Sequence, residues 1–147
     1  MKVSIGADHA AYDLKAVVIE HLKSKGIEVI DRGTYSKDSC DYPDYGIAVA
    51  TDIANGEVDR GIVICYTGIG ISIAANKVKG VRCALVGSVD AAILTREHND
   101  SNCLAMGAKY TPNELAIEIV DTWLGTEFSN MEKHQRRIDK ITNYEVK

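Results

Sequence analysis

Residues 61–77 read GIVICYTGIGISIAANK, which is a short apolar stretch, a glycine-rich turn and a second apolar stretch. Gly61–Cys65 is apolar throughout, without polar alternation, as is typical of a strand buried on both faces. Ile71–Lys77 is predicted to be a short helix, so Thr67–Gly70 connects the strand to that helix. A strand, a turn and a helix in this order are the repeating unit of parallel α/β sheets.

The same alternation continues along the chain. Four further apolar runs predict strands, at Val3–Ala7, Ile27–Asp31, Arg82–Val86 and Cys103–Met106. Helical patterns separate them, Tyr35–Tyr45 is expected to be a polar loop, and a basic helix is expected at about residues 130–143. We therefore predict an α/β fold of a single domain, residues 1–147: a five-stranded parallel sheet between two helix layers (three-layer α/β/α, Rossmann-like). The pattern leaves the strand order open.

Composition limits the class of protein. Hydrophobic residues make up 46% and charged residues 26%, as in ordinary globular proteins. The longest uncharged run, Gly61–Asn76, is shorter than the roughly 20 apolar residues of a membrane span. The polar N-terminus does not resemble a signal peptide, so we expect a cytoplasmic protein without membrane contact. The four cysteines include no CxxC pair, which favours reduced thiols and no bound metal.

Charge is unevenly distributed. The net charge is −4, yet from Lys133 to the end five basic residues stand against two acidic ones. An acidic protein with a small basic segment suits a small anionic ligand better than nucleic acid. Lys133 and Arg137 are spaced i,i+4 and share one helix face, where two cations can bind a phosphate. The alternative is an ordinary solvated helix face.

Polar residues follow the predicted strands. The first strand runs into Asp8-His9, the third ends at Cys65, and the fifth is followed by Gly107–Lys109. His98-Asn99 ends the helix that follows the fourth strand. Ligands of open α/β sheets bind beyond the carboxyl ends of the strands, so we expect these residues to gather at that edge.

Cys65 is the most informative thiol, because it precedes the start of a helix, where a thiolate is stabilised. It is a candidate nucleophile, base or redox thiol, although a small buried apolar role is the commoner fate of a free cysteine. That structural role is assigned to Cys83 and Cys103. A redox protein is disfavoured because no resolving cysteine lies near Cys65 in the sequence.

The histidines divide in a similar way. His9 and His98 each follow an element end in polar company, which makes them candidates for acid–base chemistry. His21 lies within a helical pattern and His134 within the basic helix, so both are interpreted as structural residues.

The glycine-rich turn can bind an anion, because glycines allow close approach and the helix start offers free N–H donors. A phosphate or an enediolate oxygen would fit. A dinucleotide site is an alternative, since Gly68 and Gly70 form GxG with Asp90 about twenty residues on. Ile73 occupies the third glycine position, however, and a simple tight turn also explains the pattern.

These motifs together resemble the sugar-phosphate isomerases of the ribose-5-phosphate isomerase B and LacA/LacB family. The similarity extends over nearly the whole chain and is carried by nine segments: GADHAAYDLK, GIEVIDRGT, DYPDYG, GEVDRGIVIC, TGIGISIAANK, GVRCAL, REHNDSN, LAMGA and IVDTWLGTEF. TGIGISIAANK and EHNDSN are the most specific. The resemblance implies interconversion of ribose 5-phosphate and ribulose 5-phosphate without metal or cofactor.

The resemblance also implies a role for each site residue. Cys65 is expected to be the base that moves a proton between C1 and C2 through a cis-enediolate, and His98 to assist ring opening. Thr67 and the glycine turn are expected to hold the enediolate oxygens. The other expected substrate-binding residues are Asp8, His9, Tyr42, Tyr66, Gly68, Ile69, Gly70, Asn99, Lys109, Lys133 and Arg137. A homodimer or homotetramer with sites shared between subunits is implied, the C-terminal basic helix packing on or reaching a partner subunit.

Three positions depart from the family pattern. Tyr66 stands where the family usually has Gly, inside the turn that carries the base, so it bears on substrate preference. Lys109 and Lys133 stand where Arg is common, and lysine keeps the charge but loses bidentate geometry. Two alternatives remain: an isomerase of a six-carbon sugar phosphate (allose or galactose 6-phosphate), or a non-catalytic sugar-phosphate or nucleotide binding module.

Overall fold

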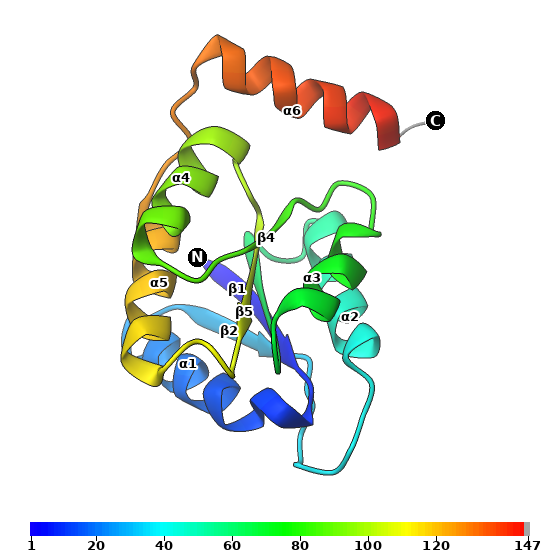
Figure 1. The fold of residues 1–147 in the computed structure, drawn as a ribbon, viewed down its shortest axis with the longest axis vertical. Coiled ribbons are helices and arrows are strands. Elements are labelled where there is room, and N and C mark those ends of the chain that lie inside the picture. The colour runs from blue at the N-terminus through cyan, green and yellow to red at the C-terminus, as the bar shows by residue number, and fades with distance from the viewer. Residues whose placement is uncertain (146–147) are drawn as a thin grey trace.

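The computed structural model describes residues 1–145, and its centre is a sheet of five parallel strands in the order β2-β1-β3-β5-β4 (Figure 1). The strands are β1 (Lys2–Ala7), β2 (Glu28–Asp31), β3 (Arg60–Cys65), β4 (Cys83–Leu85) and β5 (Cys103–Gly107). The chain leaves β1 toward one edge to form β2 and then crosses to the other side to form β3. The strand order therefore reverses between β1 and β3, which are paired neighbours. Such a switch point is where open α/β sheets bind ligands.

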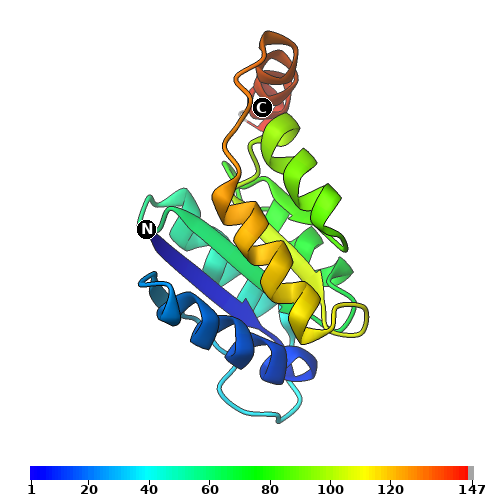
Figure 2. The same cartoon turned by 90° about the vertical axis from the view of Figure 1, so that its left-hand side faces the viewer.

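Helices cover both faces of the sheet, as the sequence predicts. After a short 3-10 turn, η1 (His9–Ala11), they are α1 (Tyr12–Ser24), α2 (Tyr42–Ala54), α3 (Ile69–Asn76), α4 (Val89–Asn99), α5 (Asn113–Gly125) and α6 (Glu132–Glu145). α1, α4 and α5 lie on one face and α2 and α3 on the other (Figures 1 and 2). The three-layer α/β/α prediction is confirmed.

Alternation along β3 determines where each side chain points. Ile62 and Ile64 pack into the core beneath α1, α4 and α5, whereas Val63 and Cys65 pack into the core beneath α2 and α3. Successive side chains of a strand point to opposite faces. The thiol of Cys65 is therefore directed toward the α2–α3 layer at the end of the strand.

The second helix begins earlier than the sequence suggested. Residues 42–45 were expected to belong to a loop, but α2 begins at Tyr42, so this expectation is wrong. Pro43 lies in the first turn, where its fixed φ and missing N–H fit a helix start, and Asp44 adds a favourable charge near the positive end of the helix dipole. The polar composition of residues 42–45 led to the loop prediction, although these residues carry the helix-start signals.

An ion pair connects Arg32, directly after β2, to Asp52 of α2. Arg32 Nε and Nη2 each donate to Asp52 of α2 at 2.7 Å, and Ser4 Oγ of β1 donates to the same carboxylate. Burial raises the pKa of Asp52, but the hydrogen bonds from Arg32 and Ser4 outweigh it and hold this pKa below its usual value. The network fixes α2, and with it Tyr42, against β1.

The last helix, α6, lies apart from the three layers. It crosses the end of the molecule opposite to the one toward which the strand arrows point, close to the end of α4 (Figure 1). Only His134 and Ile138 among its described residues are buried. The basic helix expected at about residues 130–143 is thus found within two residues of its predicted start and end. No helix formed by residues 1–145 is both long and apolar enough to cross a membrane.

Candidate active site

Cys65 ends β3 at the switch point of the sheet, and its side chain is 4% exposed. The Gly68 N–H donates to its Sγ at 3.1 Å, and α3 begins at the next residue. A backbone N–H and the start of a helix both favour negative charge. The Gly68 N–H and the start of α3 therefore both face Sγ, at the position where the sequence predicts a candidate base.

The turn that follows Cys65 is held in one conformation by close backbone packing. Gly68 has φ 79°, a left-handed conformation that favours glycine. A Cβ atom at Gly68 would lie 2.7 Å from the carbonyl carbon of Met106, and one at Gly107 would lie 2.3 Å from the Thr67 carbonyl oxygen. The loops after β3 and β5 are thus packed directly on each other, and no side chain fits between them.

Thr67 and Tyr42 complete this side of the site. Thr67 Oγ1 accepts a hydrogen bond from the Ile69 N–H at 3.2 Å. The Tyr42 ring lies over Gly70, because a Cβ at Gly70 would be 2.5 Å from the ring's Cζ. The hydroxyl of Thr67, the backbone of Gly68–Gly70 and the phenol of Tyr42 are therefore brought together near Cys65.

Asp8 and His9 follow β1, next to β3. The Asp8 N–H donates to the Ile64 carbonyl, and Asp8 Oδ1 accepts from the Ala11 N–H, which fixes the turn η1. His9 Nδ1 accepts a hydrogen bond from the Cys40 N–H at 3.2 Å. Nδ1 therefore carries no proton in this arrangement, and the proton of a neutral imidazole is on Nε2. His9 can thus donate a hydrogen bond from Nε2 to an anion.

His98 and Asn99 do not join this group, so the expectation of a single cluster at one edge is wrong for them. They end α4, and a helix that links parallel strands runs antiparallel to those strands. The Asn99 carbonyl accepts from Arg82, just before β4, and the Asn102 carbonyl accepts from Gly61 at the start of β3. His98 and Asn99 therefore lie at the amino end of the sheet. The six residues of β3, about 20 Å at ~3.3 Å per residue, separate them from Cys65.

Lys133 and Arg137 lie on α6, at the same end of the molecule as His98 (Figure 1). Both are exposed, and within residues 1–145 neither forms an ion pair with a carboxylate. Their charges are thus available to an anion. Lys109, by contrast, follows β5 and lies at the Cys65 end of the sheet.

The sequence did not identify His134 as a site residue, but its ring stacks on that of His98. The ring centroids are 4.3 Å apart, and the planes differ by 21°. Burial lowers the pKa of His134, and the neighbouring His98, Lys133 and Arg137 lower it further. The stack joins α6 to α4 and fixes the orientation of the His98 ring. No sequence signal reveals it, because 36 residues separate the two histidines.

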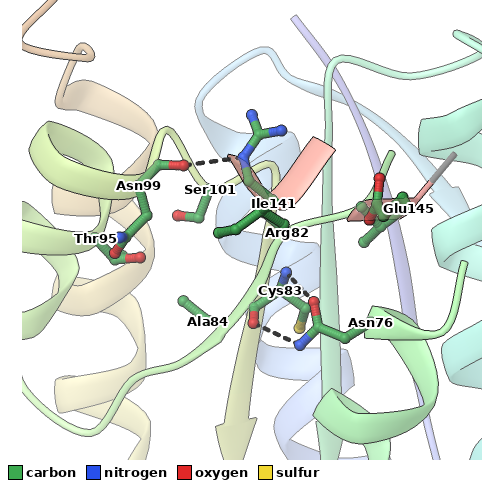
Figure 3. Close-up of a pocket in the computed structure, with 10 residues that line it drawn as sticks. Asn76, Arg82, Cys83, Ala84, Thr95, Asn99, Ser101, Ile141 and Glu145 are labelled. Carbon is green, nitrogen blue, oxygen red and sulfur yellow. Dashed lines mark hydrogen bonds between the residues drawn. The ribbon is translucent and has the colours of Figure 1, made fainter. Parts of the chain in front are cut away.

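A groove of about 440 Å³ lies between α6, α4 and β4 (Figure 3). Asn99 and Ile141 line it, and at its floor the Asn76 side chain bonds both backbone groups of Cys83 on the edge strand β4. No residue of the Cys65 group lines this groove. Among residues 1–145, no group of three or more His, Cys, Asp or Glu side chains could hold a metal ion.

Comparison with known proteins gives a consistent result. A family model described as Ribose/Galactose Isomerase matches residues 3–141. Ribose-5-phosphate isomerase B of Escherichia coli is 47% identical over 98% of this chain and 96% of its own length. Galactose-6-phosphate isomerase subunit LacB of Clostridium acetobutylicum is 43% identical over 96% of this chain and 82% of its own.

A solved structure of Clostridium thermocellum ribose-5-phosphate isomerase B is 51% identical. It superimposes with a TM-score of 0.97 over 99% of this chain and 98% of that one. The likeness therefore covers both the strand-end residues and α6, and it includes the whole fold described above. The chain belongs to the ribose/galactose isomerase family.

Proposed function

We propose that residues 1–147 form one isomerase domain that interconverts ribose 5-phosphate and ribulose 5-phosphate. The observation that carries the proposal is the Cys65 thiol, which is held at the switch point of the sheet by the Gly68 N–H at the start of α3. Removing a proton next to a carbonyl requires a base near that carbon and donors aimed at the developing oxyanion. The relatives named ribose-5-phosphate isomerase B support this choice of reaction.

In the proposed mechanism, Cys65 acts as the base. Its thiolate takes the proton from C2 of the open-chain aldose and forms a cis-enediolate, whose negative oxygen is stabilised by the Thr67 hydroxyl and the Gly70 N–H in the first turn of α3. A proton then passes from O2 to O1, and the thiol returns its proton to C1. The bonds made and broken balance within the sugar, so no cofactor or metal is needed for this step.

We propose that each site is completed by a second copy of the chain in a homodimer, or in a homotetramer built from such pairs. The separation of about 20 Å between Cys65 and His98 supports this arrangement. A two-fold axis that places α6 of each copy over the strand ends of the other would bring Cys65 of each copy next to His98 of its partner copy. The dimer would then contain two complete sites. His98 and Asn99 of the second copy would then assist ring opening.

The phosphate would be bound from both sides. His9 donates from Nε2 and Lys109 supplies a charge in one copy, while Lys133 and Arg137 of the second copy supply two more. Binding energy from the phosphate, which does not react, can orient the sugar at Cys65. The four free cysteines and the metabolic reaction support a cytoplasmic location.

A six-carbon sugar phosphate is the second candidate, favoured by the 43% identity to a galactose-6-phosphate isomerase subunit. An isomerisation assay that compares ribose 5-phosphate with allose and galactose 6-phosphates decides between them. We expect the highest kcat/KM with ribose 5-phosphate. A preference for either hexose phosphate would contradict the five-carbon assignment, and binding without turnover would show a non-catalytic module.

Cys65→Ala tests the base directly. This variant should lose isomerisation by several orders of magnitude but still bind inorganic phosphate in calorimetry, because no phosphate-binding group is removed. Cys83→Ala, at a half-buried thiol of the edge strand, is the matched control and should retain turnover. Near-normal turnover of Cys65→Ala would refute the mechanism.

A further inference from the structure

The Lys109 ammonium lies between two aromatic rings at the carboxyl end of the sheet. Lys109 Nζ is 5.5 Å from the centroid of the Tyr66 ring and 5.8 Å from that of the Tyr110 ring. Both distances are within the roughly 6 Å over which a ring face attracts a cation. The two rings are 52% and 60% exposed, so packing into the core does not explain their presence.

The backbone beneath these side chains is fixed. The Lys109 N–H donates to the Tyr66 carbonyl at 2.8 Å, and the Ala108 N–H donates to the Cys65 carbonyl at 2.9 Å. The Tyr110 N–H closes a turn on the Gly107 carbonyl at 3.0 Å. Tyr66 and Lys109 therefore start from directly bonded positions on two loops that are packed against each other, next to the thiol of Cys65.

The rings orient the ammonium without neutralising it. Within the described part of the chain, Lys109 makes no ion pair, whereas Lys15, which also lies near two tyrosine rings, is bound to Asp31 at 2.7 Å. A carboxylate partner would compete with a phosphate for the charge of Lys109. A ring attracts the same charge through its quadrupole and leaves the N–H donors free.

We infer that Tyr66 and Tyr110 are positioning residues that hold the Lys109 ammonium ready for the substrate phosphate. The inference rests on the proposed function, in which Lys109 is a phosphate ligand. A lysine side chain is flexible and binds phosphate as a point charge, without the rigid fork of arginine. The two rings reduce the freedom of the ammonium before binding, and binding then costs less conformational entropy. The effect of Tyr66 on phosphate binding thus depends on the presence of Lys109.

A double-mutant cycle on phosphate binding tests the pair. The dissociation constant of inorganic phosphate is measured by calorimetry for the wild-type protein, Tyr66→Ala, Lys109→Gln and the double variant. The same constant is measured for Tyr66→Phe, which keeps the ring, and for Tyr110→Ala. Lys23→Gln, an exposed lysine at the amino end of the sheet, controls for net charge.

We expect Tyr66→Ala to weaken phosphate binding about two- to fivefold, the effect of losing one exposed cation–π contact. Tyr66→Phe should bind like the wild type, Tyr110→Ala should weaken binding several-fold, and Tyr66→Ala should have no further effect once Lys109 is Gln. In the isomerisation assay the loss should raise KM with little change in kcat.

Two results would overturn the inference. An equal loss from Tyr66→Ala with and without Lys109 would show that the ring contacts the ligand itself. An unchanged dissociation constant in both Tyr66→Ala and Tyr110→Ala would show that the rings do not position the ammonium. Because the cycle measures phosphate binding alone, a wild-type protein that binds phosphate but does not isomerise sugars would refute the proposed function and leave this test intact.

Discussion

Replacing Gly68 by alanine perturbs the turn on which the chemistry of Cys65 depends. Gly68 has φ 79°, and a Cβ there would lie 2.6–2.8 Å from Leu85 Cδ1, the Met106 carbonyl carbon and the Gly107 nitrogen. The left-handed conformation costs an alanine about 1–2 kcal/mol. Two of the three contacts are backbone atoms that cannot turn aside, which adds about 1–3 kcal/mol for overpacking.

Gly26 provides a matched control for this substitution. It has φ 76°, nearly the same as Gly68, but nothing lies within 4 Å of a Cβ built on it. Gly26→Ala should therefore lower the free energy of unfolding only by the conformational cost of about 1–2 kcal/mol, whereas Gly68→Ala should lower it by about 2–5 kcal/mol. Urea unfolding at fixed protein concentration measures both values.

The two variants should differ even more in catalysis. To relieve the contacts, the turn must move, and the Gly68 N–H then leaves the Cys65 Sγ. In the proposed mechanism Sγ is charged, and losing a hydrogen bond to a charged group costs about 1.5–3 kcal/mol, so the rate of isomerisation should fall about 10- to 150-fold. Gly26→Ala should keep the wild-type rate. Equal stability and equal rate in the two variants would refute the reasoning about the turn.

Two further predictions concern ionisable groups. Asp52→Asn should lower the free energy of unfolding at pH 7 by about 2 kcal/mol, because Asp52 is buried while its partner Arg32 is partly exposed. Since the folded pKa of Asp52 is lowered, its contribution to stability is fully present above about pH 3.9 and is lost as the pH falls through the folded pKa. Urea titrations at several pH values measure this loss. The folded pKa of His134 is also lowered, so protonation opposes folding, and stability should decrease as the pH falls below about 6.5 toward that pKa. His134→Gln should show a weaker pH dependence in the same window, and identical slopes for both proteins would contradict a buried, stacked His134.

Most of the fold could be predicted because it depends on local pattern. Continuous apolar runs identify the five strands, and the glycine turn after Cys65 is visible in the sequence. The start of α2 at Tyr42 was missed because its residues are polar, although Pro43 and Asp44 signal a helix start. The strand order, and with it the switch point between β1 and β3, came only from the structure.

The site was predicted less completely, for a reason that lies in the direction of the helices. His98 ends a helix that runs back along the sheet, so its nearness in sequence to β5 does not place it at the carboxyl edge. The stacking of His134 on His98 and the position of Tyr66 beside Lys109 depend on tertiary contacts. Residue type and local spacing cannot reveal such pairs.

Mixing two variants that each lack one site residue tests the shared site most directly. Cys65→Ala and His98→Asn are co-expressed, each with its own tag, and the isomerase activity of the mixture is compared with that of either variant alone. If a second copy supplies His98, each mixed dimer holds one site with both residues intact. Random pairing makes half of the dimers mixed, so about a quarter of the wild-type activity should return. Activity no higher than that of the separate variants would show that Cys65 and His98 of one chain serve the same site, and would contradict a site built from two copies.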